Sequence, residues 1–298
     1  MKLTGRRESS NVDDRRGSSK TKTAGGVSIV GIIVAMLVVY LQGGNPLSVL
    51  SDSSIITSNV STSETGEAYQ PTAEEEEMAT LCRQILASTE DVWTKKFQEV
   101  GLEYEPPTLV LFTESVQSAC GGATSAVGPF YCSADKMLYI DLSFLTTMKQ
   151  SLGVKASKGN DLFELAYAYV VAHEVGHHVQ NLLGTLSQVH QKMNQLPDAQ
   201  ANQQSVRLEL QADYLAGVWA QGENNMYNSL EEGDIADAIN TALVIGDDYL
   251  QKKAQGKAVP ESFTHGTAQQ RARYLKAGIE GGTIKGANIL FTKDYDQL

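Results

Sequence analysis

One apolar segment, residues 160–182, constrains this chain most, because its second half, residues 171–182, carries four ionisable side chains where a buried helix would normally have none. These side chains are His173, Glu174, His177 and His178. Burying such groups is costly unless they pair with one another or bind a metal ion. The segment therefore predicts a helix built around a metal site, and a pair of satisfied structural histidines is the alternative.

The spacing of the two outer histidines supports the metal site. His173 and His177 are four residues apart, so in a helix their imidazoles leave one face about 40° apart. Two neutral imidazoles at this spacing can bind one zinc ion. Glu174 can reach a zinc-activated water without being a ligand, and its carboxylate can accept the proton as that water attacks a carbonyl. The H-E-x-x-H motif thus predicts a zinc hydrolase with Glu174 as its base.

A zinc site of this kind needs a third protein ligand and an open fourth position. His178 leaves the helix from a different face, and His190 lies in a polar, glutamine-rich segment. We therefore expect Glu209, on a later helix rich in small residues, to complete one site with one zinc ion per chain. Asp213 follows four residues later on the same face, where it can accept the second N–H of a ligand histidine. An ordinary acidic pair on a solvated face is the alternative.

A second apolar run, residues 27–41, contains no charged residue. With its flanks it can cross about 30 Å of hydrocarbon as a helix, so we predict a single-pass transmembrane anchor over residues 25–44. A cleaved signal peptide would have a shorter apolar core and a small-residue cleavage site. Seven basic residues precede the run and none follows it before Arg83. The positive-inside rule therefore places the N-terminus in the bacterial cytoplasm and the catalytic domain outside the cytoplasmic (inner) membrane.

Composition divides the remainder of the chain. Residues 1–24 are basic and polar, and we expect a cytoplasmic tail without packed structure. Residues 45–72 are expected to form a flexible stalk. Residues 73–298 predict one domain, which begins with a long amphipathic helix and ends with helices up to about residue 280. Between them, apolar runs predict three strands, at residues 108–112, 128–132 and 137–141. The domain is thus α+β, mainly helical with a small sheet.

Charge and cysteine content limit the partners and the compartment. The net charge of −11, from 35 acidic and 24 basic residues, disfavours nucleic acid, which requires clustered positive charge. We therefore expect a protein or peptide substrate, and contact with the membrane through the anchor. Three cysteines are too few for a disulfide scaffold. Outside the cytoplasm Cys120 and Cys132, which enclose a glycine-rich loop, can form a disulfide, and two buried thiols are the alternative. The state of Cys82 stays open.

These motifs resemble a known group of enzymes. H-E-x-x-H followed on a later helix by E-x-x-A-D is similar to the gluzincins, distantly including the CAAX-processing and heat-shock membrane proteases. The chain is closer to the bacterial neutral zinc metallopeptidase family. It resembles that family at GRRESSNVDDRRG, SACGGATSAVGPFYC, HEVGHHVQ, LELQAD with LAGVWA, IGDDYLQ and FTHGTAQQR. The resemblance implies a zincin-like domain with His173, His177 and Glu209 as ligands and Glu174 as base. It implies no particular substrate.

Several weaker signals lie late in the chain. His265 could stabilise an oxyanion near the metal, or cap the helix that follows it. Arg271 could bind a peptide carboxylate or form a structural salt bridge, and we favour the salt bridge. Residues 246–248, Gly-Asp-Asp, could suggest a cation site but fit a helix end better. Two departures from the resemblance are Tyr214, where relatives often have Cys, and Gly266, where the wider group has Pro.

Taken together, the motifs predict a zinc-dependent metalloendopeptidase. The alternative from a different class is a zinc-stabilised binding or scaffold protein of the cell envelope that does not catalyse. The presence of Glu174 favours the enzyme, because a protein without turnover has no need to keep a base beside the metal.

Overall fold

The computed structural model describes residues 1–3, 5–17, 69–125, 128–143, 161–231, 233–244 and 246–298. The chain divides into two compact units. We call them the helical unit (Met1–Asn11, Thr80–Pro107 and Val154–Leu298) and the sheet unit (Val12–Ala79 and Thr108–Gly153). The long helix α3, Ala73–Glu99, contributes its first turns to the sheet unit and the rest to the helical unit.

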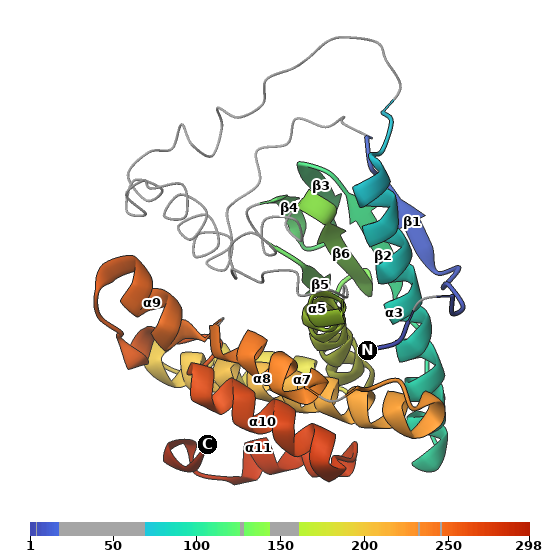
Figure 1. Cartoon of the computed structure of the whole chain (residues 1–298). Coiled ribbons are helices and arrows are strands. Elements are labelled where there is room, and N and C mark those ends of the chain that lie inside the picture. The colour runs from blue at the N-terminus through green and yellow to red at the C-terminus, as the bar shows by residue number, and fades with distance from the viewer. Residues whose placement is uncertain (4, 18–68, 126–127, 144–160, 232, 245) are drawn as a thin grey trace. The chain divides into compact units, whose positions relative to one another are not determined.

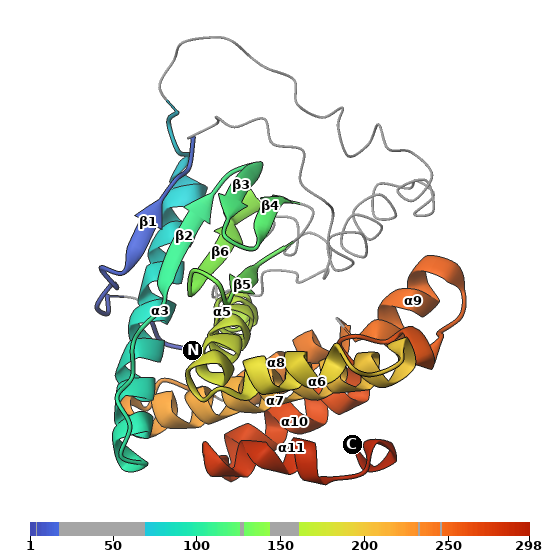
Figure 2. The same cartoon turned by 180° about the vertical axis from the view of Figure 1, so that it is seen from behind.

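The sheet unit contains a four-stranded mixed sheet in the order β1-β2-β6-β5 (Figure 2). Both β1 and β6 run parallel to β2, whereas β5 is antiparallel to β6. The two central strands are apolar and almost wholly buried, as expected for strands covered on both faces. A separate hairpin pairs β3 with β4. The strands are β1 Val12–Asp14, β2 Thr108–Phe112, β3 Ser115–Ser118, β4 Gly121–Thr124, β5 Phe130–Cys132 and β6 Met137–Asp141.

A disulfide joins Cys120 to Cys132 within the sheet unit, with 5.8 Å between their Cα atoms. Cys132 also belongs to the unit's buried core, together with Val110, Phe112 and Tyr139. The bond therefore ties the glycine-rich loop directly to this core. Cys82 is a buried thiol on α3.

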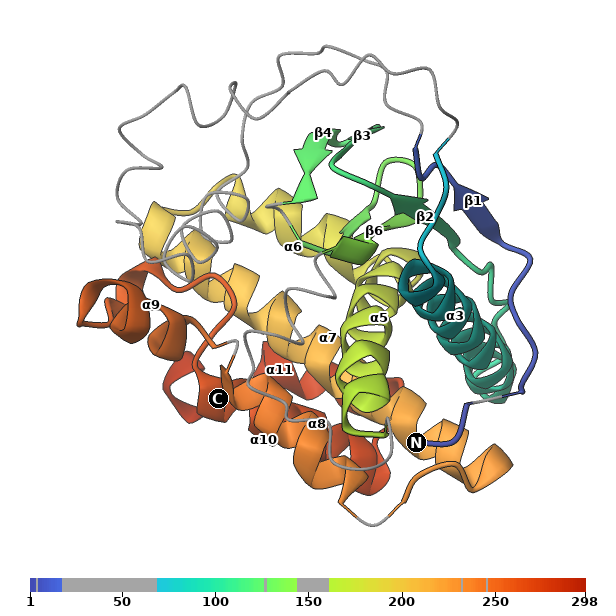
Figure 3. The ribbon, with the colours of Figure 1, turned by 45° about the horizontal axis from the view of Figure 1, so that its top comes forward.

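The helical unit is built around α7, which packs against α5, α6 and α10 (Figures 1 and 3). Its described helices are α5 Asp161–Leu182, α6 Thr185–Met193, α7 Asp198–Tyr227, α8 Asp234–Val244, α9 Asp247–Gln255, α10 Ala268–Gly281 and α11 Ile289–Thr292. Short 3₁₀ turns, η2 Pro260–Ser262, η3 Lys285–Asn288 and η4 Tyr295–Gln297, connect or follow them.

Small residues let α7 approach its neighbours closely. A Cβ added at Gly176 of α5 would lie 2.9 Å from the carbonyl oxygen of Ala212 on α7. On another face of α7, a Cβ added at Gly217 would lie 2.8 Å from the Cα of Gly278 on α10. Separations this short exclude a larger side chain at either contact. These small residues therefore fix α7 between α5 and α10.

The expectation that the N-terminal tail lacks packed structure is wrong for the described residues 1–17. Met1 and Leu3 are buried, and Val12–Asp14 forms edge strand β1. Arg6 forms an ion pair with Glu223, whose carboxylate is fully buried and also accepts a hydrogen bond from Ser88. A buried carboxylate requires a cation, so basic residues that look like a solvated tail are instead structural partners.

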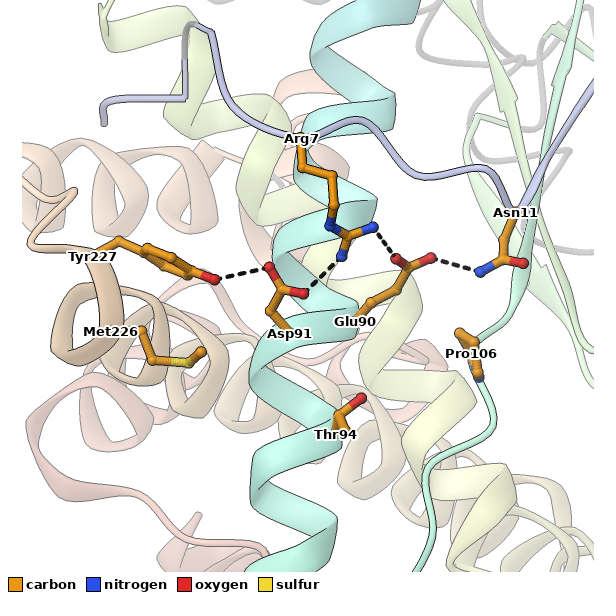
Figure 4. A pocket seen from close by; sticks show the side chains of 8 residues that line it. All are labelled: Arg7, Asn11, Glu90, Asp91, Thr94, Pro106, Met226 and Tyr227. Carbon is orange, nitrogen blue, oxygen red and sulfur yellow. Dashed lines mark hydrogen bonds and ion pairs between the residues drawn. The ribbon is translucent and has the colours of Figure 1, made fainter.

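Arg7 makes a second set of contacts in the same segment, in the pocket drawn in Figure 4. Its guanidinium lies between Glu90 and Asp91 of α3, at 2.9 and 2.7 Å. Glu90 also accepts hydrogen bonds from Ser9 and Asn11, at 2.5 and 2.8 Å. The N-terminal segment is thus held to α3 by several charged contacts at once, which extends the predicted domain beyond residues 73–298.

The other predicted elements agree with the structure where it describes them. The long helix begins and ends within a residue or two of its predicted bounds, and the three predicted strands correspond to β2, β5 and β6. The predicted anchor, residues 25–44, and most of the predicted stalk lie outside the described residues. Among the described residues, no helix is long and apolar enough to cross a membrane.

Replacing Arg6 tests the N-terminal contact. Arg6→Ala should lower the free energy of unfolding by about 3 kcal/mol, because it leaves the Glu223 carboxylate buried without a cation. Lys2→Ala is the matched control in the same segment. Lys2 is 71% exposed in its ion pair with Glu231, so the loss should be too small to resolve. Urea unfolding would measure both, and equal stability of the two variants would contradict a structural role for residues 1–11.

Candidate metal centre

Helices α5 and α7 bring together the three residues predicted as ligands. His173 and His177 lie one turn apart on α5, and Glu209 faces them from α7. His173 Nε2 is 3.2 Å from Glu209 Oε2, and His177 Nε2 is 3.5 Å from Glu209 Oε1. One donor atom from each residue lies within 4.8 Å of the other two. The two imidazole rings meet edge to face, at 87°.

The geometry of this cluster fits a zinc ion. Zinc binds imidazole nitrogen and carboxylate oxygen at about 2.0–2.1 Å, and in a tetrahedral site neighbouring donors are then about 3.3 Å apart. Each imidazole Nε2 lies close to that separation from one of the two Glu209 oxygens, at 3.2 Å for His173 and 3.5 Å for His177. Two imidazoles with one carboxylate form a donor set typical of catalytic zinc, in which the fourth position is open to water or substrate.

Asp213 orients the first ligand histidine. Its Oδ1 is 2.8 Å from His173 Nδ1, so that nitrogen donates its proton to the carboxylate and leaves Nε2 facing Glu209. Asp213 is fully buried, and the Nε–H of Arg271 donates to its Oδ2 at 2.8 Å. Tyr169 donates its hydroxyl proton to Oδ1 at 2.5 Å. Arg271 therefore has the structural role that the sequence favoured, as the cation that compensates a buried carboxylate.

Gln180 performs the corresponding task for His177. Its side-chain oxygen lies 2.9 Å from His177 Nδ1, and its side-chain nitrogen donates to the carbonyl oxygen of Leu208 at 2.6 Å. Leu208 immediately precedes Glu209 on α7. The buried amide of Gln180 therefore orients His177 and also ties α5 to the residue beside Glu209. Sequence analysis missed both Gln180 and Tyr169. Their spacing of three and four residues from the ligand histidines was the available signal.

The pKa values of the three predicted ligands reflect the same contacts. Burial lowers the pKa of His173, but the Asp213 and Glu209 carboxylates outweigh it and raise that pKa to about 10. Burial also lowers the pKa of His177, but the Glu209 carboxylate outweighs burial and raises that pKa above its usual value. The pKa of Glu209 falls well below its usual value because the two rings outweigh the effect of burial. The site thus attracts positive charge strongly, and a metal ion bound there would take the place of ring protons.

The remaining predicted residues occupy distinct places. Glu174 is partly exposed on α5, and its charge contributes to the raised pKa of His177. His178 is buried away from the cluster, with Nε2 2.7 Å from the carbonyl oxygen of Glu105. His190 is exposed on α6. His265 lies in the loop before α10, where its Nδ1 is 3.2 Å from Asp247 Oδ1.

Comparison with known proteins agrees with this donor set. The family model described as "Putative neutral zinc metallopeptidase" matches residues 1–290. The chain belongs to this family. Its match includes residues 1–17, whose packing the composition did not predict. The comparisons give no support to the more distant resemblance to CAAX-processing and heat-shock membrane proteases.

Relatives in bacteria share much of the chain. "Uncharacterized protein YpfJ" of Escherichia coli K12 is 42% identical over 289 residues, which cover 95% of this chain and 96% of that protein. "Uncharacterized protein Mb2605" of Mycobacterium bovis is 39% identical over 188 residues, 60% of each chain. No solved structure matches. The family therefore supports a zinc peptidase, whereas the names of these relatives add no activity.

The amide of Gln180 provides a test of how the centre is held. Gln180→Leu should weaken zinc binding about 10-fold or more, because His177 loses the partner that fixes its orientation. A competitive chelator titration would measure the affinity. Gln191→Leu, at an exposed position on α6, is the matched control and should leave it unchanged. Equal zinc affinity in the two variants would show that Gln180 does not orient the ligand.

Proposed function

We propose that this protein is a zinc metalloendopeptidase of zincin-like fold that hydrolyses peptide bonds in protein or peptide substrates, with one zinc ion per chain. The observation that carries the proposal is the cluster of His173, His177 and Glu209, with nitrogen–oxygen distances suited to zinc. Membership of the neutral zinc metallopeptidase family supports it independently.

The residues of the site divide the chemistry between them. Zinc, when bound, polarises a carbonyl group and lowers the pKa of water. His173, His177 and Glu209 would hold that ion. Glu174 is the base: its carboxylate accepts the proton of the attacking water and returns it to the departing amine nitrogen. Asp213 and Gln180 hold Nδ1 of the two ligand imidazoles, which leaves Nε2 of each facing Glu209.

The rival proposal is a zinc-stabilised scaffold protein without turnover. In that case Glu174 would be one more surface carboxylate of α5. The exposure pattern favours the enzyme: His173 is buried, whereas Glu174 beside it is partly exposed and remains accessible to substrate and water. A base must be within reach of the reacting water, so this difference is what catalysis requires.

We also propose that residues 25–44 attach the protein to the bacterial cytoplasmic membrane, with the zinc unit on its outer side as the sequence predicts. The support is the length and apolarity of that run. The Cys120–Cys132 disulfide is consistent with an oxidising compartment.

Substitution of Glu174 separates catalysis from metal binding. Glu174→Gln should keep zinc and the fold but lose about 10²-fold or more of the peptidase rate, because an amide cannot accept the proton. The rate would be measured on unfolded envelope proteins with the full chain, and zinc by elemental analysis. The double variant His173→Ala/His177→Ala should lose both zinc and activity. Equal cleavage by wild type and Glu174→Gln would favour the scaffold instead.

A further inference from the structure

The first residues of the chain are an integral part of the helical unit. Leu3 is fully buried there. The backbone N–H of Lys2 donates to the carbonyl oxygen of Ser229, just beyond the end of α7, at 2.9 Å. The backbone N–H of Ser9 donates to the carbonyl oxygen of Arg83 on α3, at 3.0 Å. The segment is therefore packed along its length by its backbone as well as by its side chains.

Buried charge makes these contacts hard to lose. Arg6 is the cation paired with Glu223, whose side chain is 0% exposed. Glu223 lies on α7, the helix that also carries the third predicted metal ligand. Arg7 lies between Glu90 and Asp91, at 2.9 and 2.7 Å. A carboxylate removed from water is strongly destabilising without a cation, so the unit that contains the metal centre depends on these two arginines.

The sheet unit holds the next residues in the same way. Strand β1 pairs with β2 in parallel, and Arg16 forms an ion pair with Glu76 at 2.7 Å. Gly17 approaches the Tyr69 side chain so closely that an added Cβ would overlap it. The two described residues that flank segment 18–68 therefore lie next to each other.

This adjacency conflicts with a single transmembrane span between the flanking residues. One crossing would separate them by about 30 Å of hydrocarbon. Two crossings would bring them back to the same side, but they need about 40 apolar residues. Segment 18–68 contains one long apolar run, residues 27–41. An odd number of crossings thus contradicts the packing, and the sequence is too short in apolar residues for an even number.

The basic residues on which the predicted orientation depends have partners within the fold. Seven of them precede the apolar run. The positive-inside rule interprets such an excess as a cytoplasmic signal. Five of the seven form ion pairs with acidic side chains, namely Lys2, Arg6, Arg7, Arg15 and Arg16. The fold therefore accounts for these residues without a cytoplasmic location.

We infer that residues 1–17 and the metal centre occupy the same compartment, and that residues 25–44 attach the protein to the membrane from one side without carrying the chain across it. This inference builds on the proposed membrane attachment and is independent of the proposed peptidase activity. A single-pass topology would let the N-terminal segment respond to the cytoplasm while the zinc unit acts outside. The packed arrangement excludes that division of roles.

Crosslinking in intact cells tests the packing directly. Lys2 Nζ lies 2.7 Å from Glu231 Oε1, and the two side chains are 71% and 36% exposed. In the full-length double variant Lys2→Cys/Glu231→Cys, a short membrane-permeant bismaleimide should join the two thiols before the cells are lysed. Mass spectrometry would identify the joined peptides, and each single variant is a control that should give none. Absence of the joined peptides in intact cells, whatever forms after lysis, would overturn the inference.

Cysteine labelling tests the shared compartment in a second way. Ser10→Cys and Lys285→Cys place thiols at exposed positions of the N-terminal segment and of the helical unit. With the outer membrane permeabilised, an impermeant maleimide should label both variants or neither, and both after lysis. The wild-type chain, whose Cys82 thiol is buried, is the background control.

The labelling result also separates this inference from the proposed location. Labelling of both variants in intact cells agrees with a zinc unit on the outer side of the membrane. Labelling of neither would reject that side but support the shared compartment. Labelling of one variant alone would overturn the inference.

Discussion

A single buried carboxylate, Asp213, joins the helices on which the candidate site depends. From α7 it contacts His173 and Tyr169 on α5 and Arg271 on α10. A charge fully removed from water is stable only with its partners in place, and losing one such partner typically costs several kcal/mol. The contacts of Asp213 therefore join the three helices and also fix the orientation of His173. A change that disturbs the helical packing here also disturbs the site.

The two ligand histidines are held by different chemistry. His173 donates to a carboxylate that Arg271 neutralises, whereas His177 faces the neutral amide of Gln180. A carboxylate partner makes an imidazole a stronger donor to a metal than an amide does. The amide in turn joins α5 to the backbone beside Glu209. One ligand is thus adjusted electronically and the other geometrically.

Local periodicity explains what the sequence could predict. Some features depend only on residues that are close together in the sequence, and the structure agrees with each of them. They are the apolar helix 161–182, the strands β2 and β6, and the ligand spacing. Gln180 and Tyr169 have no distinctive chemistry, so only their spacing could have suggested them. The packing of residues 1–17 could not be predicted from the neighbouring sequence. Arg6 is 217 residues away from Glu223, and composition without that partner looks like a disordered tail.

The separation of Arg6 from Glu223 also has a consequence during synthesis. At about 5–20 residues per second, the ribosome makes Glu223 roughly 10–40 s after Arg6. Throughout that interval the first residues of the chain have no acidic partner on α7. Strand β1 likewise waits for β2, which is made about a hundred residues later. The beginning of this polypeptide is consequently among the last parts to reach its final environment, and it must stay accessible until the C-terminal helices have emerged.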